Sequence, residues 1–180
     1  MKLYEPLPDF VEVKGKRYKI FTDFRIWLKL YSMVKAKEEI QFSDYYSGAY
    51  PNNMEDCLSG VIQFFLMKEN NVFNKEEKGA SRTKKNVISF EVDAPFIASA
   101  FLQCYGIDLF RESTKMHWWK FRMLLDGLPA DTEIKKRITY RSMDAASIKD
   151  KKERERIRKI QAEIALPQEV LSDYEIGNAF

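Results

Sequence analysis

The sequence has a single histidine, His117, and only two cysteines, Cys57 and Cys104, among 180 residues. The common zinc sites of helical proteins need two ligands close together on one helix face, so this class of metal site is not expected. The same scarcity leaves His117 without a second histidine, or an identifiable serine or cysteine partner, to orient it as a catalytic base. We therefore interpret His117, which precedes Trp118 and Trp119, as a structural residue satisfied by a backbone acceptor.

Glycine is also scarce, and its seven positions are scattered at expected turns and helix ends. Phosphate-binding loops need closely spaced glycines at a strand-to-helix turn, so the sequence does not support nucleotide binding. Carboxylate pairs such as Glu38-Glu39 and Glu76-Glu77 stand in charged runs, where no apolar surroundings would raise a pKa for acid catalysis. We accordingly expect no catalytic residue, no cofactor and no metal, and therefore a protein that is not an enzyme.

Long hydrophobic runs are missing as well. No stretch approaches the roughly eighteen uninterrupted apolar residues of a membrane span, and the N-terminal residues lack the apolar segment of a signal peptide. The wide spacing of Cys57 and Cys104 gives no metal motif, and two buried free thiols are expected in a reducing compartment. The sequence therefore favours a cytosolic protein that does not insert into a membrane.

The chain is rich in apolar residues at regular spacing, with 45% hydrophobic and 14% aromatic content. Apolar residues recur with helical periodicity from Phe24 to Val34 and from Met54 to Phe65, which predicts two buried helices. Residues 10–21 alternate with period two about Lys14-Gly15, which predicts a tight hairpin. We predict a mainly α fold, a single helical domain at residues 1–166 with a small N-terminal β-hairpin.

The stretch from Asp93 to Leu128 concentrates large apolar and aromatic residues. Asp93 is a typical helix N-cap, whose side chain would accept from backbone N–H groups, and Gly106 is typical of a helix C-terminus. A second helix is predicted to begin at Ser113 or Thr114. Because the link between the two helices is short, we predict that they pack as an antiparallel pair.

Charge is distributed unevenly, although the net charge is only +3. Residues 68–86 are almost wholly polar, and we interpret them as an exposed, mobile loop. A long helix is predicted at about residues 145–165, with a basic, solvated first half and isoleucines on one face of its second half. Residues 167–180 form an acidic C-terminal tail that also has apolar residues and has no Lys or Arg.

The basic segment raises the question of nucleic-acid binding. Between Glu133 and Lys159 the chain has eleven Lys or Arg and five acidic residues, an excess of six positive charges. The intervening acids would repel phosphates, and aromatic stacking platforms are missing apart from Tyr140. A solvated helix with pairs such as Glu155 and Lys159 is the favoured interpretation, and an acidic protein partner is the second. Nucleic acid is the least favoured partner.

Two strings in the apolar stretch resemble a known family. YGIDL at residues 105–109 and HWWKFRMLLDGL at residues 117–128 are similar to the signature of the bacteriophage gene-product-fifteen family, found in siphophages and prophages of Gram-positive bacteria. The likeness extends in weaker form from about Leu7 to Leu166. Cys104, where the family usually has a polar residue, and the end from Leu171 onward depart from the pattern. The resemblance implies a tail assembly chaperone that acts beside the tape-measure protein.

This implied function is non-enzymatic. The chaperone would bind the tape-measure protein, with the major tail-tube protein as a second partner, in the cytoplasm of the bacterial host, and would be absent from the mature virion. A long helical client with exposed apolar stripes aggregates unless the stripes are masked, and a small helical protein can mask them. Candidate partner-binding residues are taken from the basic helix and from the tail: Ile157, Ile160, Ile164, Arg154, Arg158, Leu171, Tyr174 and Phe180.

Other interpretations remain open at this level. The three isoleucines could equally pack on the protein's own core. Opposite charge on the basic helix and the acidic tail predicts self-association between copies, or capping within one copy. The alternatives to a chaperone are a basic adaptor associated with DNA or packaging, and a structural component that stays in the tail.

Overall fold

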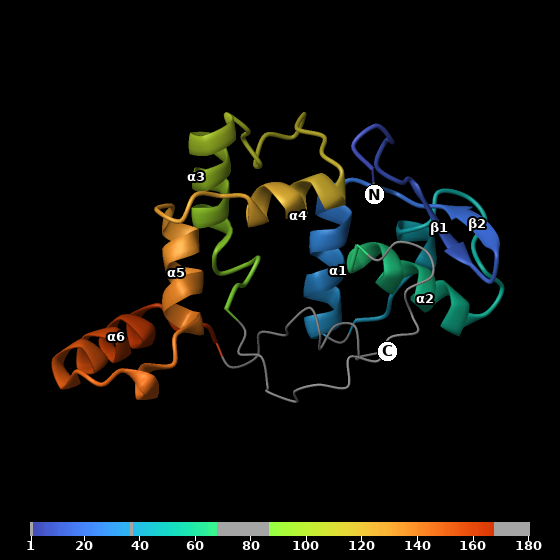
Figure 1. Ribbon diagram of the computed structural model, residues 1–180. Coiled ribbons are helices and arrows are strands. Elements are labelled where there is room, and N and C mark those ends of the chain that lie inside the picture. The colour runs from blue at the N-terminus through green and yellow to red at the C-terminus, as the bar shows by residue number, and fades with distance from the viewer. Residues whose placement is uncertain (1, 37, 68–86, 168–180) are drawn as a thin grey trace. The chain divides into compact units, whose positions relative to one another are not determined.

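The computed structural model describes residues 2–36, 38–67 and 87–167. Within these residues the chain forms six α-helices, two 3-10 helices and one antiparallel hairpin (Figure 1). The predicted mainly α fold with an N-terminal hairpin is confirmed. The elements in chain order are β1 (Phe10–Val13), β2 (Lys16–Lys19), α1 (Phe24–Ala36), η1 (Phe42–Asp44), α2 (Met54–Phe65), α3 (Ala94–Tyr105), α4 (Trp118–Asp126), α5 (Glu133–Ser142), η2 (Ala145–Ser147) and α6 (Lys151–Glu163).

The chain divides into two compact units, and each is described by itself. The first contains the hairpin, α1, α2 and the start of α4, and the second contains α3, the end of α4, α5 and α6. The division into a domain at residues 1–166 and a tail at 167–180 stays a prediction. The loop predicted at residues 68–86 and tail residues 168–180 lie outside the described residues.

The hairpin forms as its sequence predicts. Val13 pairs with Lys16 across a two-residue turn, in which Lys14 and Gly15 have φ values of 52° and 74°. Turns with two positive φ angles match the twist of paired strands, and glycine adopts this conformation without strain. Val11 and Val13 alternate with exposed or partly exposed neighbours and are buried. The buried face of β1 packs against α2.

α2 comes unusually close to the hairpin at Gly60. A Cβ atom on Gly60 would overlap the Tyr46 hydroxyl and would lie 3.1 Å and 3.2 Å from methyl groups of Val11 and Val13. The hydroxyl is held in place because it donates to the carbonyl of Cys57 at 2.8 Å. Lack of space, and not backbone conformation, therefore requires glycine at this position.

Aromatic residues from α1, α2 and α4 form the core of the first unit. The ring centroids of Trp27 and Phe64 are 4.7 Å apart, and those of Phe24 and Phe121 are 5.1 Å apart in a stacked pair. Trp118 is fully buried among them and stacks on Phe121. These rings come from three helices, so burying them joins the helices into one core.

The start of α4 also satisfies the end of α2. The indole N–H of Trp118 donates to the carbonyl of Phe65 at 2.9 Å, and that of Trp119 donates to the carbonyl of Phe64 at 2.8 Å. Carbonyls in the last turn of a helix lack full intrahelical pairing, and the two indoles supply donors there, although the Phe64 carbonyl also accepts the N–H of Met67 at 3.1 Å. The predicted antiparallel pair within residues 93–128 is therefore wrong. The aromatic start of α4 packs in the first unit, whereas α3 packs against α5.

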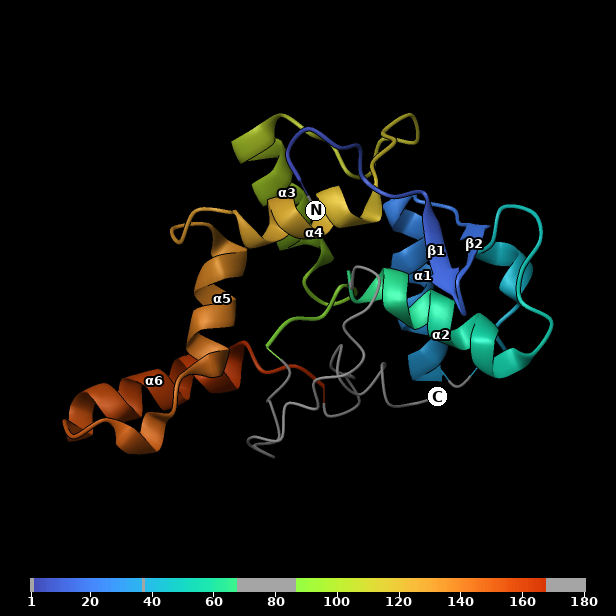
Figure 2. The ribbon, with the colours of Figure 1, turned by 45° about the vertical axis from the view of Figure 1, so that its right-hand side comes forward.

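In the second unit, α3 and α5 pack through fully buried side chains that include Phe101 and Ile134. At the edge of this contact, the guanidinium of Arg137 lies 3.8 Å from the ring centroid of Phe96. Gly106 ends α3 in the left-handed conformation, with φ at 66°, which confirms the predicted glycine cap. In Figures 1 and 2, α6 lies at the end of α5.

Candidate protein-interaction surfaces

The basic helix is shorter than predicted at its N-terminal end. α6 begins at Lys151 instead of at about residue 145, and the 3-10 helix η2 precedes it. Asp150 caps α6 by accepting the N–H of Glu153 at 2.7 Å, and Asp144 caps η2 in the same way. Because an Asp side chain competes well for the free N–H groups at a helix start, two successive aspartates begin two separate elements.

One side of α6 is attached to α5. Ile157, at 3% exposure, is the residue by which α6 enters the core of the second unit. The side-chain amide of Gln161 donates to the carbonyls of Tyr140 and Met143, each at 2.8 Å. These carbonyls belong to the C-terminal end of α5, where intrahelical pairing is incomplete, and that of Tyr140 also accepts the N–H of Met143 at 3.3 Å. The contact therefore combines apolar burial with completion of a helix end.

The opposite side of α6 is basic and exposed. The helix has six Lys or Arg and three Glu among 13 residues. We call its five exposed bases the basic face of α6: Lys151, Lys152, Arg156, Arg158 and Lys159. Within the part of the chain that the structure describes, one of the five has an acidic partner, Arg156 with Glu153 at 3.1 Å. An exposed pair of this kind is weak, so the face stays open to stronger partners.

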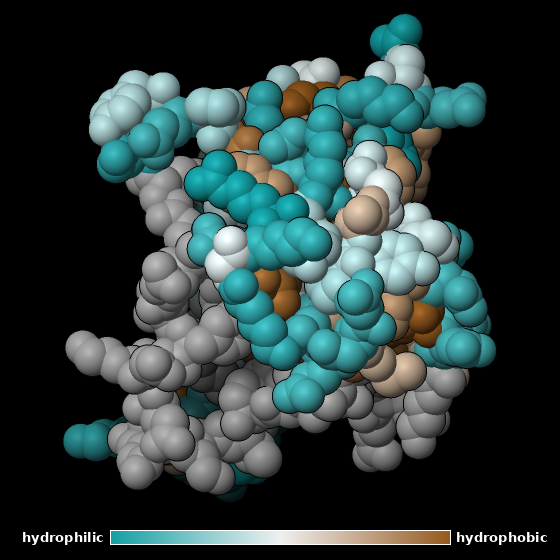
Figure 3. All heavy atoms as spheres, turned by 90° about the vertical axis from the view of Figure 1, so that its right-hand side faces the viewer, coloured by the Kyte–Doolittle hydropathy of each residue, from teal (hydrophilic) through white to brown (hydrophobic). Residues whose placement is uncertain are grey.

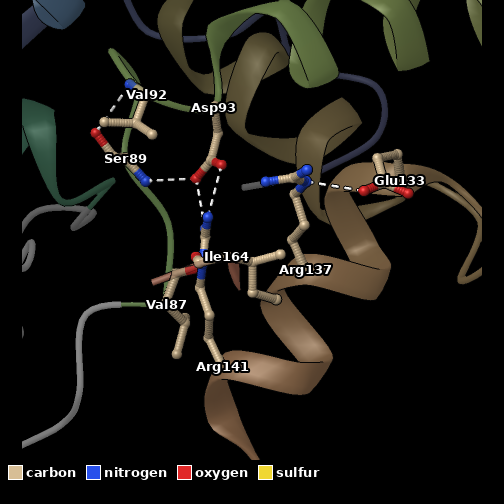
Figure 4. A network of polar contacts seen from close by, with 8 residues as sticks. All are labelled: Val87, Ser89, Val92, Asp93, Glu133, Arg137, Arg141 and Ile164. Carbon is tan, nitrogen blue, oxygen red and sulfur yellow. Dashed lines mark hydrogen bonds and ion pairs between the residues drawn. The ribbon is translucent and has the colours of Figure 1, made fainter. Parts of the chain in front are cut away.

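A buried ion pair joins α5 to the start of α3 (Figure 4). Arg141 donates from Nη1 and Nη2 to the two carboxylate oxygens of Asp93, at 2.6 Å and 3.0 Å. The two side chains are 5% and 0% exposed, and the N–H of Ser89 donates to the same carboxylate at 2.9 Å. The predicted capping of α3 by the Asp93 side chain is wrong, because the carboxylate faces Arg141 and makes no cap hydrogen bond. A bidentate, charge-assisted ion pair is stronger than a helix-cap hydrogen bond.

Arg141 also binds two backbone carbonyls. Its Nη1 donates to Val87 at 3.1 Å, and its Nε donates to Ile164 at 2.7 Å. Ile164 follows the last residue of α6, and Val87 begins the segment that leads into α3. One guanidinium on α5 therefore binds the start of α3, the segment that leads into α3 and the end of α6 (Figure 4).

The candidate partner-binding residues have different surroundings. Ile157 is buried, whereas Ile160 and Ile164 are partly buried. Arg154 turns toward the chain and donates to a backbone carbonyl that precedes α6, whereas Arg158 is exposed. Partner binding by these residues stays a prediction. Among the described candidates, Ile160, Ile164 and Arg158 have surface that a partner can reach. The tail candidates lie outside the described residues: Leu171, Tyr174 and Phe180.

The sequence pattern does not reveal that two apolar residues of the second unit are exposed. Leu102 is 55% exposed and Phe110 is 73% exposed. Phe110 lies in a turn organised by Asp108, whose carboxylate accepts the Phe110 N–H at 2.9 Å and whose carbonyl accepts from the hydroxyl of Thr114 at 2.7 Å. The turn leaves Leu109 buried and Phe110 outward. An aspartate two residues before an aromatic residue is the local signal for such a turn.

The first unit has a different surface character. On the side that carries the hairpin and α2, hydrophilic residues predominate and apolar residues show in small separate areas (Figure 3). The exposed strand of the hairpin, β2, consists largely of basic residues. Lys14 in the turn forms an ion pair with Asp56 of α2 at 2.8 Å. The hydrogen bond between the two side chains, together with their opposite charges, raises the pKa of Lys14 and lowers the pKa of Asp56.

His117 has a structural position. Its Nε2 lies 2.9 Å from the carbonyl of Pro8, and its Nδ1 accepts the N–H of Trp119 at 3.0 Å. These contacts favour the neutral ring with its proton on Nε2. The imidazole also supplies the acceptor at the start of α4. The helix therefore starts just after His117, and the predicted start at Ser113 or Thr114 is wrong.

Replacing His117 by asparagine is expected to reduce the pH dependence of stability. Burial lowers the pKa of His117 below its ordinary value of 6.5, although the Pro8 carbonyl and Asp9 oppose the shift. The unfolded chain then binds the proton more readily, so stability is complete above about pH 6.5 and falls as the pH drops toward the lowered pKa. Asparagine still accepts the Trp119 N–H but does not titrate. Urea unfolding of both proteins at about pH 5.5 and about pH 7.5 measures the effect. An equal difference between the two proteins at both pH values would contradict it.

Neither a metal-binding cluster nor a membrane-spanning helix is found in the described ranges. There, no group of three or more His, Cys, Asp or Glu side chains is arranged to hold a metal ion. Cys57 is a buried free thiol and Cys104 a partly buried one. Burial raises the pKa of the Cys57 thiol, which disfavours the reactive thiolate. Among the helices of the described residues, none combines the length and the apolar character that crossing a bilayer requires.

Comparison with protein families gives a match over residues 3–166 to the family described as Bacteriophage Gp15 protein. The chain belongs to this family. The match includes the hairpin, all six helices and both strings that carry the resemblance, so that prediction is confirmed. The tail candidates lie beyond the part that matches the Bacteriophage Gp15 family. Neither the curated proteins nor the solved structures give a match.

Proposed function

We propose that the chain is a phage tail assembly chaperone that binds the tape-measure protein and helps to recruit tail-tube subunits. The observation that carries this proposal is membership of the Bacteriophage Gp15 family over residues 3–166. The surfaces of the second unit support a binding role. Ile160 and Ile164 are partly exposed beside the basic face of α6, and Phe110 is presented by an ordered turn.

A surface of this kind suits a helical client. Ile160 and Ile164 are four residues apart and so lie on the same face of the helix. An apolar stripe of a client helix can cover them while its acidic residues meet Arg156, which lies one turn before Ile160, and the neighbouring bases. Each contact is small, so affinity for a long client comes from many copies bound along it. Tail-tube subunits can then displace the copies one at a time.

Co-expression tests the proposal. The tape-measure protein of the same phage is expected to be soluble with the wild-type chain and to become insoluble with the variant Ile160→Lys/Ile164→Lys, since lysine opposes apolar contact. Met54→Lys is the matched control, because Met54 is 70% exposed in the first unit and is expected to leave solubility unchanged. Circular dichroism checks that each variant folds. A tape-measure protein that is equally soluble without the chain would refute the proposal.

The basic face of α6 favours one alternative, an adaptor associated with DNA or packaging. The acids Glu153, Glu155 and Glu163 on the same helix weaken attraction to phosphates. Titration of duplex DNA at about 50 mM and about 200 mM salt separates the two functions, because phosphate contacts weaken steeply with salt. Tight, salt-sensitive binding would favour the adaptor. Mass spectrometry of purified particles addresses the third function, a structural tail component, which would be found in the virion.

A further inference from the structure

The bases on the basic face of α6 fall into two rows that differ in character. Side chains three or four positions apart are neighbours on a helix surface, which places Lys152, Arg156 and Lys159 in one row. The other row joins Lys151 and Arg158, and an acidic residue stands between them. The first row, which we call the basic row, runs over two turns without an intervening acid.

The basic row also borders apolar surface. Ile160 follows Arg156 by four residues, and Ile164 follows Ile160 by four, so this side of the helix continues as an isoleucine edge. Both isoleucines are partly buried and keep accessible surface. The residues three or four positions from Arg158 include no large apolar side chain. Positive charge and apolar surface are therefore combined on one side of the exposed half of α6.

The rest of the second unit holds α6 in a defined orientation. Ile157 is buried, and Gln161 donates to two carbonyls at the end of α5. On the same side, Arg154 donates to the carbonyl of Ile148 at 3.0 Å. All of these residues belong to the second unit, as do the basic row and the isoleucine edge. A partner consequently meets a pre-organised helix and does not bear the cost of ordering it.

We propose that this side of α6 binds an acidic, amphipathic helix of the client. Its Glu or Asp side chains face Lys152, Arg156 and Lys159, and its aliphatic side chains cover the isoleucine edge. The inference rests on the proposed function, because it names the chemistry of the client segment that the chain recognises. Charge complementarity supports it, since α6 has six bases and three acids. Within the described ranges, Arg156 is the member of the row with an acidic partner, the exposed Glu153, and such a weak pair exchanges readily.

The spacing of the basic row favours a helix over an extended segment. Its bases are four and three residues apart, which corresponds to about 6 Å and 4.5 Å along the helix axis. Side chains on one face of a strand are about 6.6 Å apart, so a strand loses register by the third base. A partner helix has the same rise as α6, and acids at the same spacing meet all three bases.

The acids on α6 favour protein over nucleic acid as the occupant. Glu153 lies three residues before Arg156, and Glu163 follows Lys159 by four residues, so acids flank the basic row. Phosphates occur at every step of a nucleic-acid backbone and are repelled where the row ends. A helix can place neutral or basic side chains opposite these two acids. The surface therefore selects client segments by their charge pattern and rejects basic ones.

Binding of synthetic peptides to the full chain, followed by fluorescence anisotropy, tests the proposal. The probe is a labelled helical peptide of about five turns that carries a row of Glu beside a row of Leu. A matched peptide has Gln in place of Glu. The wild-type chain is expected to bind the Glu peptide roughly tenfold more tightly at about 50 mM NaCl, since three exposed pairs contribute about twofold each. At about 500 mM NaCl the preference should shrink to about twofold or less.

Variants of α6 locate the contact. Lys152→Glu/Lys159→Glu should lose the preference for the Glu peptide and should bind a third peptide, with Lys in place of Glu, more tightly than the wild type does. Lys151→Glu/Arg158→Glu makes the same change in net charge on the other row and should keep the preference. Ile160→Ala should weaken binding of the Glu and Gln peptides by a similar factor. Circular dichroism checks that each variant folds.

Each contrary result has a distinct meaning. Equal binding of the Glu and Gln peptides by the wild type overturns the proposal. Equal loss in the two charge reversals shows that net charge alone acts, and overturns the assignment to the basic row. Unchanged binding by Ile160→Ala overturns the assignment to the isoleucine edge.

Two further results separate the proposal from its alternatives. Duplex DNA that displaces the labelled Glu peptide at lower concentration than the unlabelled peptide does would assign the surface to nucleic acid and overturn the proposal. The peptides contain no tape-measure sequence, so the peptide result does not depend on the chaperone test. A tape-measure protein that is soluble without the chain refutes the chaperone role, whereas preference for the Glu peptide would still show a site for an acidic helix.

Discussion

Replacing Arg141 by methionine is expected to lower the free energy of unfolding by about 3–5 kcal/mol. The substitution leaves the carboxylate of Asp93, which is 0% exposed, with a hydrogen bond from the N–H of Ser89 but without its positively charged partner. The carbonyls of Val87 and Ile164 lose their guanidinium donors as well. A buried charge without its partner is among the most destabilising single changes. Urea unfolding followed by circular dichroism at neutral pH measures the loss.

A double-mutant cycle tests the cause of that loss. Asp93→Asn combined with Arg141→Met should be more stable than Arg141→Met alone, because the uncompensated charge is gone. Arg137→Met is the matched control, one turn earlier on α5. Its ion pair with Glu133 is partly exposed, with side-chain exposures of 21% and 53%, so a loss of about 1 kcal/mol or less is expected. Strictly additive losses for Asp93 and Arg141 would contradict a coupled pair.

Replacing Gly60 by alanine is expected to lower the free energy of unfolding by about 1–3 kcal/mol, although alanine is the better helix former. The added methyl group overlaps the Tyr46 hydroxyl and comes within 3.1 Å of Val11. α2 must then move from the hairpin, or Tyr46 must give up its hydrogen bond to the Cys57 carbonyl. Thermal unfolding of the two proteins, analysed as a difference, measures the effect.

Tyr46→Phe is the background that isolates the clash. Without the hydroxyl, the nearest atoms to the new methyl group are those of Val11 and Val13, at 3.1 Å and 3.2 Å. Gly60→Ala should then cost less than about 1 kcal/mol, because side-chain methyl groups can shift by a few tenths of an ångström. An equal loss in the two backgrounds would show that the hydroxyl does not cause the strain.

The features that local sequence determines were predictable. The positive-φ turn at Lys14-Gly15, the glycine cap at Gly106 and the periodic helices α1 and α2 each depend on residues a few positions apart. The cap of α2 follows the same rule, since Asn53 accepts the N–H of Asp56 at 2.8 Å. Turn, cap and periodicity signals all act within one or two helical turns, so composition and spacing carry them.

The errors arise where distant residues compete with local signals. Asp93 has the residue type and position of a cap, yet Arg141 lies 48 positions away in sequence and offers a stronger, charged partner. The indole of Trp118 finds its acceptor in Phe65, 53 positions away, which assigns the start of α4 to the first unit. Spacing within 93–128 cannot report either contact. At the interaction surface, spacing grouped Ile157 with Ile160 and Ile164, but burial separates them.

The most direct test of the chaperone role is the fate of the tape-measure protein in host cells that carry the phage without this chain. If the chain masks apolar stripes of that protein during tail assembly, the tape-measure protein should be found in the insoluble fraction and complete tails should be missing. Expression of the chain from a plasmid should restore both. A soluble tape-measure protein, together with tails of normal length and number, would contradict the proposed function.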